Sequence, residues 1–383
     1  MMKRKGETDM ERFRKTGRLL ITLMLMLSLT ALAACSGGAD GGSEESSGAK
    51  PETDTVRLAV FQHGHILNAI AEAQGYLEEE GIKVEYVPVE TDTEIFEGIE
   101  KGTIDIASNS GTNLPLQMIA DGKDLTMFGG YLLTGCMPVF AKVDTEWTGV
   151  ESLVGKTMAC EPNMFAVSGP LLDKGYDPLK DVNWYNPEDQ NDRIKAVKEG
   201  KADFGLVGTQ FNYVIDSDPE LKVCTYASDL LPDYSCCRVE ASTKWLNENP
   251  NTAKALLRAW IRAQAYYESN HEESVKFISE ITGQDEAFLR SHMDNPHFDI
   301  NTDPLKSSIE RAWDYLGRIG LLSEEAKKID IDDHINTELY KEALDECQKK
   351  YGKDNPKFYE KMQSEYSKFD QEDIVIETDE TDD

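Results

Sequence analysis

Four short segments of this sequence concentrate side chains that can hydrogen-bond a small molecule. They lie at residues 62–65, 108–113, 161–164 and 208–210. Hydroxyl and amide groups bind polar ligand atoms, and the free N–H groups at a helix start favour a negatively charged atom. The candidate binding residues are Gln62, His63, His65, Ser108, Asn109, Ser110, Gly111, Thr112, Glu161, Asn163, Thr209 and Gln210.

Each segment follows an expected strand and precedes an expected helix, so its polar residues could instead be helix caps. For any one segment, capping is the simpler interpretation. Four segments together favour a shared cleft, because ligands of open α/β sheets bind beyond the carboxyl ends of the strands. We therefore predict that Asn109→Ala or Glu161→Ala weakens ligand binding and leaves thermal stability nearly unchanged.

Residue spacing gives little support for catalysis or metal binding. His63 and His65 could act as acid and base, with Glu161 assisting. However, the sequence after residue 34 has no Gly-x-Ser-x-Gly elbow, no Walker loop and no Gly-x-Gly-x-x-Gly. It also lacks the Cys-x-x-Cys and His-x-x-x-His pairs that suit zinc. We predict no catalytic residue, no metal and no cofactor.

Short apolar runs that alternate with amphipathic segments must position these candidates. Strands are expected at 56–61, 82–87, 104–107, 156–160 and 182–185, and helices at 66–73, 93–101 and 189–199. This alternation predicts α/β architecture with parallel sheets covered on both faces. The spacing of Gly102 and Asp105 recurs at Gly200 and Asp203, which indicates two halves of similar build.

Beyond Asn249 the chain is predicted to be mostly helical. A helix that starts at Pro250 places its apolar residues on one face; these are Ala253, Leu256, Leu257, Trp260 and Ile261. Further helices are expected at 272–281, 286–292, 305–319 and 336–350. No long linker separates them from the α/β part, so we expect them to pack on one lobe.

The N-terminus has the features of an export signal. Seven basic residues precede an apolar run, 19–34, which is shorter than the ~20 residues that span a bilayer. Cys35 follows small residues, as in the bacterial lipoprotein motif that this segment resembles. We predict a signal peptide over 1–34, lipidation at Cys35, a flexible tether over 35–54 and a location on the extracytoplasmic face of the cell membrane. An ordinary signal peptide or an uncleaved anchor is the alternative.

The charge of the chain excludes one class of partner. The net charge is −31, and removal of residues 1–34, with seven basic and three acidic residues, leaves −35. Such a surface repels phosphate backbones, so we expect no nucleic-acid partner, and we expect a monomer. The acidic tail, 370–383, is predicted to be disordered. Six cysteines besides Cys35 permit either disulfides or free thiols, and the sequence leaves this open.

Several stretches resemble the nitrate/sulfonate/taurine-type substrate-binding proteins of ABC transporters. They are residues 56–65, 71–84, 102–107, 153–157 and 249–253, in the order and spacing of that family. The likeness extends from Thr55 to about Leu344. It implies a two-lobed periplasmic-binding-protein fold of type II, with a hinge, that closes on a small solute and delivers it to an ABC permease.

The resemblance also implies how the lobes divide the chain. Residues 55–140 and 239–350 would build lobe 1, with the C-terminal helices packed on it, and residues 141–238 would build lobe 2. Two doubly wound sheets would result, with the cleft between them.

The family also resembles the fungal thiamine-pyrimidine synthase. That enzyme has a histidine ten residues before a turn glycine, as His65 stands before Gly75, and a cysteine-rich run that Cys236 and Cys237 match in part. Arg238 and the next residues depart from that run, which argues against iron binding and synthesis. A related enzyme, or a ligand sensor without a transport role, is the alternative function.

The ligand class stays open between two chemistries. A sulfonate, nitrate or taurine-like solute would use hydroxyl and N–H groups, and Arg238 would favour it. A pyrimidine or thiamine-precursor-like solute would use stacking faces, and Glu161 would favour its N–H groups. The candidate stacking residues are Phe61, Tyr131, Phe165, Phe211 and Tyr234.

Overall fold

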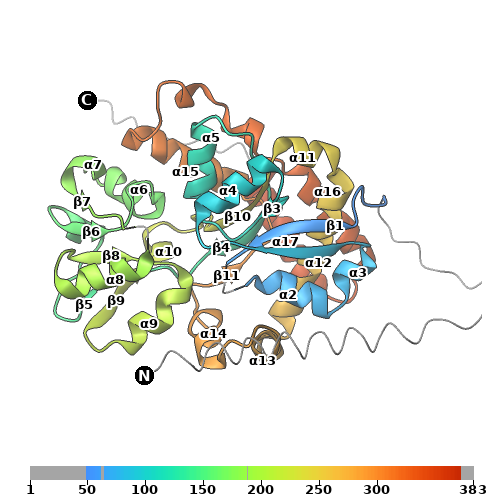
Figure 1. Ribbon diagram of the computed structural model, residues 1–383, viewed down its shortest axis with the longest axis horizontal. Helices are drawn as coiled ribbons and strands as arrows, with labels where there is room; N and C mark the ends of the chain where they lie inside the picture. Colours follow the sequence, from blue (N-terminus) through green and yellow to red (C-terminus); the bar gives the residue numbers. More distant parts are fainter. Residues whose placement is uncertain (1–48, 62–63, 188, 372–383) are drawn as a thin grey trace, which may run out of the picture. The chain divides into compact units, whose positions relative to one another are not determined.

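The structure is a computed structural model that describes residues 49–61, 64–187 and 189–371 (Figure 1). The predicted signal peptide, Cys35, Gln62 and His63 lie outside the described residues. Among the described residues, no helix is both long enough and apolar enough to cross a membrane.

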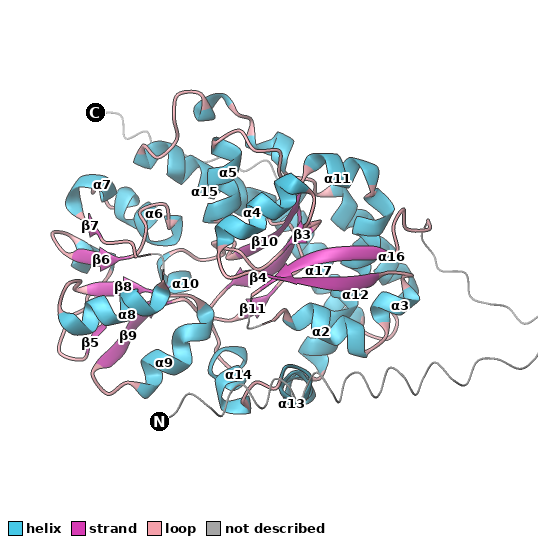
Figure 2. Ribbon diagram, viewed as in Figure 1, coloured by secondary structure: helices cyan, strands magenta, loops and turns pink. Residues whose placement is uncertain are grey.

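The first sheet has the strand order β11-β4-β10-β3-β1-β2 (Figure 2). Strands β2 and β3 run parallel to β1, whereas β10 runs antiparallel to its neighbours β3 and β4. The strands are β1 (Thr55–Val60), β2 (Lys83–Pro88), β3 (Ile106–Ala107), β4 (Thr126–Thr134), β10 (Cys237–Ala241) and β11 (Asp299–Ile300). We call this sheet with its helices the first lobe.

The second sheet repeats this plan with the order β7-β6-β8-β5-β9. Strands β7 and β8 run parallel to β6, and β5 runs antiparallel to β8 and β9. The strands are β5 (Pro138–Lys142), β6 (Thr157–Ala159), β7 (Asn183–Trp184), β8 (Phe204–Leu206) and β9 (Leu221–Tyr226). We call this sheet with its helices the second lobe.

The repeated Gly and Asp residues have the same role in both lobes. Gly102 and Gly200 end their helices with φ values of 68° and 73°, where a side chain would be strained. Asp105 Oδ2 accepts from the N–H of Arg57 at 2.8 Å, and Asp203 Oδ2 accepts from the N–H of Thr157 at 2.9 Å. Each aspartate therefore ties the end of a helix–strand loop to a parallel strand of its sheet, β1 in the first lobe and β6 in the second.

The helices of the first lobe before the crossing are α2 (Ile66–Ala73), α3 (Tyr76–Glu79), α4 (Asp92–Lys101) and α5 (Asn113–Ala120). Those of the second lobe are η1 (Val150–Leu153), α6 (Phe165–Asp173), α7 (Pro178–Asp181), α8 (Gln190–Glu199), η2 (Thr209–Phe211), α9 (Asn212–Ser217) and α10 (Ala227–Leu230). The C-terminal part adds α11 (Thr243–Glu248), α12 (Pro250–Ser269), α13 (His271–Thr282), α14 (Glu286–Met293), α15 (Lys306–Ile319), η3 (Ala326–Lys328), η4 (Ile331–His334), α16 (Glu338–Tyr351), α17 (Pro356–Tyr366) and the π-helical turn η5 (Ser367–Gln371).

The predicted apolar face of α12 is the centre of the first lobe. Leu256, Leu257 and Trp260 are fully buried, and the helix packs between α2 and α16. Two other C-terminal helices contact the second lobe, because α15 packs on α6 and α14 packs on α9. The C-terminal helices therefore belong to the first lobe but reach across to the second.

The chain crosses between the sheets twice, at 135–137 and at 231–236. Pro138–Phe140, expected in lobe 1, pair in the second sheet, and Arg238, expected in lobe 2, pairs in the first. The apolar pattern continues from β4 into β5, and both strands are almost wholly buried, so the sequence shows no break at the crossing.

Both ends of the folded part differ from the expected ones. Glu52, expected in the tether, accepts from the N–H of Thr252 at 2.9 Å and so fixes the start of α12. Helix α17, beyond the expected limit at 350, was not predicted. Asp370, expected in a disordered tail, accepts from the N–H of Lys306 at 2.9 Å. Residues 372–383 lie outside the described part of the chain.

Candidate functional site

Loops at the carboxyl ends of strands from both sheets form the candidate site. In the first sheet they follow β1 and β3, at 61–65 and 108–112; in the second they follow β6 and β8, at 160–164 and 207–211. These are the positions at which open α/β sheets bind ligands.

Side-chain hydrogen bonds join these loops to one another. Asn109 Nδ2 donates to the carbonyl oxygen of Gly64 at 3.0 Å, within the first lobe. Asn113 Nδ2 donates to Asn163 Oδ1 at 3.3 Å, from the first lobe to the second. Asn113 ends the predicted loop, 108–113, but is not one of the candidate binding residues. The bond between Asn113 and Asn163 shows that the loops of the two sheets face each other.

The loops also contact both crossings. The N–H of Thr112 donates to the carbonyl oxygen of Cys236 at 2.9 Å. The amide of Asn212, at the start of α9, donates to the carbonyl oxygen of Cys136 at 2.5 Å and to that of Thr209 at 2.8 Å. A change in the angle between the lobes would therefore act directly on the loops.

His65 has a structural role at the start of α2. Its Nδ1 accepts from the N–H of Asn68 at 3.1 Å, which makes it the N-cap of the helix. Its ring stacks on Tyr131 and on Trp260, with centroid distances of 4.2 and 4.7 Å. Whether His65 also contacts a ligand stays a prediction.

The loop after β3 directs several polar groups into the first lobe. Ser110 Oγ donates to Glu240 Oε1 at 2.5 Å, and Gly111 forms a β-bridge with Cys237. Ser108 is fully buried, and its hydroxyl has no hydrogen-bond partner among the described residues. These bonds fix the loop against β10.

Glu161 forms an ion pair with Arg193 of α8. The guanidinium also donates to Asn186 Oδ1 at 2.9 Å and to the carbonyl oxygen of Leu206 at 3.3 Å. The side chains of Arg193 and Glu161 are only 9% and 21% exposed. Arg193 therefore offsets the charge of Glu161, and the preference of Glu161 for the N–H groups of a nitrogenous ligand stays a prediction. Arg193 lies on the apolar face of α8 with Ala196 and Val197. An arginine among apolar residues was the only feature of the sequence that could have indicated a buried ion pair here.

The loop after β8 presents Thr209 and Gln210 as the first turn of η2. Both are partly exposed, as are Asn109, Gly111, Glu161 and Asn163. By contrast, His65, Ser108, Ser110 and Thr112 are buried. The partly exposed group contains the candidates that can contact a solute without a rearrangement of the core.

Arg238 is fully buried in the first lobe. Its guanidinium donates to the carbonyl oxygens of Asp303 and Leu132. Burial lowers its pKa to about 10, so it remains charged at neutral pH. Tyr131, Phe165 and Tyr234 are also buried, whereas Phe61 and Phe211 stay partly exposed.

The six described cysteines are free thiols, and three of them lie at the crossings. Cys136 is in the first crossing; Cys236 and Cys237 are at the end of the second, with their sulfurs 3.5 Å apart. Within the described ranges, no group of three or more His, Cys, Asp or Glu residues could hold a metal ion.

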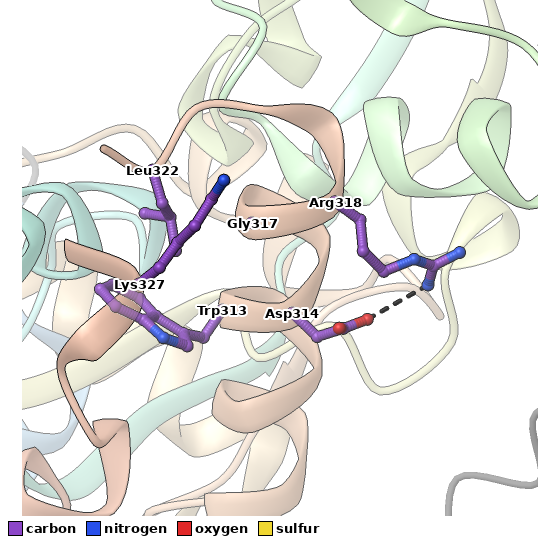
Figure 3. Close-up of a pocket in the computed structure, with 6 residues that line it drawn as sticks. All are labelled: Trp313, Asp314, Gly317, Arg318, Leu322 and Lys327. Carbon is purple, nitrogen blue, oxygen red and sulfur yellow. Dashed lines mark hydrogen bonds and ion pairs between the residues drawn. The ribbon is translucent and has the colours of Figure 1, made fainter. Parts of the chain in front are cut away.

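A shallow pocket elsewhere does not belong to this site. It is lined by Trp313, Asp314, Gly317, Arg318, Leu322 and Lys327, on α15 and the segment that follows (Figure 3). None of these residues is in the four loops.

Solved structures with the same architecture include periplasmic binding proteins. The alkanesulfonate-binding protein SsuA of Xanthomonas axonopodis pv. citri, bound to MOPS, has a TM-score of 0.60 and 16% identity, over 74% of this chain and 98% of that one. The nitrate-binding protein NrtA of Synechocystis PCC 6803 has a TM-score of 0.63 and 19% identity, over 78% and 90%. A Candida albicans protein with the generic periplasmic-binding-protein fold has a TM-score of 0.57 and 15% identity, over 74% and 96%. At such identities the likeness shows the fold alone.

The chain therefore has the periplasmic-binding-protein fold, which confirms the predicted fold class. The family described as NMT1/THI5 like matches residues 62–274, more than half of the chain, and this protein belongs to that family. No curated protein sequence matches the chain.

Proposed function

We propose that this protein is the extracytoplasmic solute-binding component of an ABC importer. It would close its two lobes on a small solute and deliver it to the membrane permease, held near the membrane by a lipid on Cys35. The observation that carries the proposal is the hydrogen bond between Asn113 and Asn163, which joins cleft loops of the two lobes. A ligand that contacts both lobes favours the closed form by its differential affinity for it.

The ligand is proposed to be a sulfonate, nitrate or taurine-like solute, or a pyrimidine or thiamine-precursor-like solute. Two of the solved structures named above are an alkanesulfonate-binding and a nitrate-binding protein. In this chain the Glu161–Arg193 pair leaves the loop after β6 without net charge. Hydroxyl, amide and backbone N–H groups would then make the contacts, and both chemistries accept such donors.

A thermal-shift screen tests the proposal. Residues 46–383, which include every residue that the structure describes, are purified and mixed with alkanesulfonates, taurine, nitrate and thiamine-pyrimidine precursors. A true ligand stabilises the folded state by RT ln(1 + [L]/Kd), about 2.7 kcal/mol at one hundred times Kd. If no compound of the panel shifts the unfolding temperature, the proposed solute classes are wrong; turnover of a compound would instead support the enzyme alternative.

A further inference from the structure

Helix α15 belongs to the first lobe but touches the second. Leu305, just before the helix, packs with Leu133 of β4 and with Phe369, which fixes its start to the first lobe. Farther along, α15 packs on α6 of the second lobe (Figure 1). Helix α6 begins directly after the cleft loop that carries Glu161 and Asn163.

Three residues spaced i, i+4 and i+7 on α15 make polar contacts outside the first lobe. Arg311 Nη2 donates to the carbonyl oxygens of Pro232 and Asp233 in the second crossing, both at 2.7 Å. The hydroxyl of Tyr315 donates to the carboxylate of Asp173 at the end of α6. Arg318 Nη2 lies 3.3 Å from the other oxygen of the same carboxylate.

The tyrosine ring lies directly against the backbone of α6. A Cβ atom at Gly169 would lie 2.9 Å from three ring atoms of Tyr315, and the tyrosine is only 6% exposed. Glycine at 169 therefore permits this close contact, and the Tyr315 hydroxyl reaches Asp173 one helical turn farther along α6.

We propose that three residues of α15 form a clasp that holds the second lobe in the closed arrangement: Tyr315 and Arg318 act through Asp173, and Arg311 acts through the second crossing. The proposal rests on the proposed function, because a clasp has a role only if the lobes part. The clasp lies outside the four cleft loops, so it would set the balance between open and closed forms without contacting the solute.

The Tyr315 hydroxyl makes the less screened of the two polar contacts with Asp173. A hydrogen bond to a carboxylate is stronger than one between neutral groups. Burial, with the bond to Asp173, raises the pKa of Tyr315 to about 12, so its hydroxyl is a donor at neutral pH. The Arg318–Asp173 pair is about half exposed on both sides, so solvent and salt screen it.

The chain offers a matched control. Arg318 also pairs with Asp314 on its own helix, with Nη1 3.1 Å from Oδ2 (Figure 3). Asp314→Ala removes this partner and leaves Asp173 untouched. The test variants are Asp173→Ala and Tyr315→Phe, the second of which keeps the packed ring.

The experiment is small-angle X-ray scattering of residues 46–383 without added ligand, with unfolding temperatures measured in parallel. We expect a larger radius of gyration for Asp173→Ala and Tyr315→Phe, and an unchanged one for Asp314→Ala. For any solute that binds, the apparent Kd of the two test variants should rise about tenfold, because the closed form is less populated.

The clasp is ruled out if both test variants scatter as wild type does, even if they unfold at lower temperature; the contact would then be ordinary packing. The scattering is measured without ligand, so it tests the clasp independently of whether a solute has been identified. If no solute in the screen shifts the unfolding temperature, the proposed solute classes are contradicted, but the scattering result still shows whether the clasp controls the distance between the lobes.

Discussion

Arg193 determines the geometry of the cleft loop after β6. It ties Glu161 to Asn186 and to the carbonyl oxygen of Leu206, so it joins two loops and a strand of the second lobe. Polar groups at the rim of a binding cleft are useful only if their positions are fixed, and this ion pair fixes them. Glu161 is therefore first a structural residue.

Glu161→Ala should destabilise the protein, in contrast to the effect expected from sequence. Removal of the carboxylate leaves Arg193 buried without its ion-pair partner, which costs about 3 kcal/mol of the free energy of unfolding. Urea denaturation measures this loss. The matched variant Glu161→Ala/Arg193→Met removes both charges and should recover part of it; a stability of the single variant equal to wild type would contradict the structural role.

Asn109→Ala should behave differently, because Asn109 is partly exposed. Its bond to the Gly64 carbonyl contributes about 1 kcal/mol, so the unfolding temperature should fall only slightly. The affinity for the solute found in the screen should fall by about tenfold or more. Isothermal titration calorimetry measures this, and unchanged affinity would remove Asn109 from the binding site.

At the scale of elements, the C-terminal turn η5 is attached to the first lobe through a pair of carboxyl groups, Asp370 of η5 and Asp303. Asp303 and Asp370 interact in the first lobe, near the buried guanidinium of Arg238. Lys306 donates its N–H to Asp370, and the hydroxyl of Tyr340 lies close to the group. Burial and the neighbouring Asp370 raise the pKa of Asp303 well above its ordinary value, and burial also raises the pKa of Asp370.

This pair should make stability fall with rising pH. The folded protein keeps a proton that the unfolded chain releases near pH 4, so the free energy of unfolding decreases from there up to the folded pKa, by at most about 1.4 kcal/mol per pH unit. Asp370→Asn should reduce this slope, because it removes one of the two carboxyl groups, and the variant should be more stable than wild type at pH 8.

Urea midpoints between pH 4 and 8 measure the effect. Asp345→Asn is the control, since Asp345 pairs with Lys341 at the surface and should leave the slope intact. Equal slopes for wild type and Asp370→Asn would show that the pair holds no shared proton.

Elements with a clear period were predictable from the sequence, and those defined by distant contacts were not. The strand before Gln62 and the helix with Trp260 on its buried face follow directly from apolar spacing. Helix α17 has a start signal, Asn355 before Pro356, but its buried face is short and follows a polar segment. The attachment of Asp370 depends on Lys306, 64 residues away, so no local pattern shows it.

At the scale of the whole molecule, the loop positions were predictable but their contacts were not. Strand ends indicated which loops converge, because that follows from parallel topology. The Asn113–Asn163 bond and the Arg193 pair depend on how two sheets face each other. The clasp residues of α15 resemble an ordinary polar helix face in the sequence, because their partner Asp173 is more than 130 residues away.

Thiol reactivity should report on the opening of the lobes. Cys136, Cys236 and Cys237 are buried at the crossings, and burial raises the pKa of Cys136 to about 12. In residues 46–383 with Cys224→Ser, which removes the partly exposed thiol among the described cysteines, a disulfide reagent should react slowly with the native protein. A bound solute should slow the reaction at least several-fold, and a rate that solute leaves unchanged would contradict closure at these crossings.

The strand exchange between the lobes fixes the order in which the two sheets can be completed. The second sheet is complete once the chain has reached Tyr226, since β5 to β9 are consecutive. The first sheet lacks its middle strand until β10 at 237–241 is present, and until then β3 and β4 keep unpaired edges. The second lobe can therefore fold during synthesis as soon as its own residues have left the ribosome. The first lobe, which contains the N-terminal strand β1, must wait for β10, β11 and the C-terminal helices.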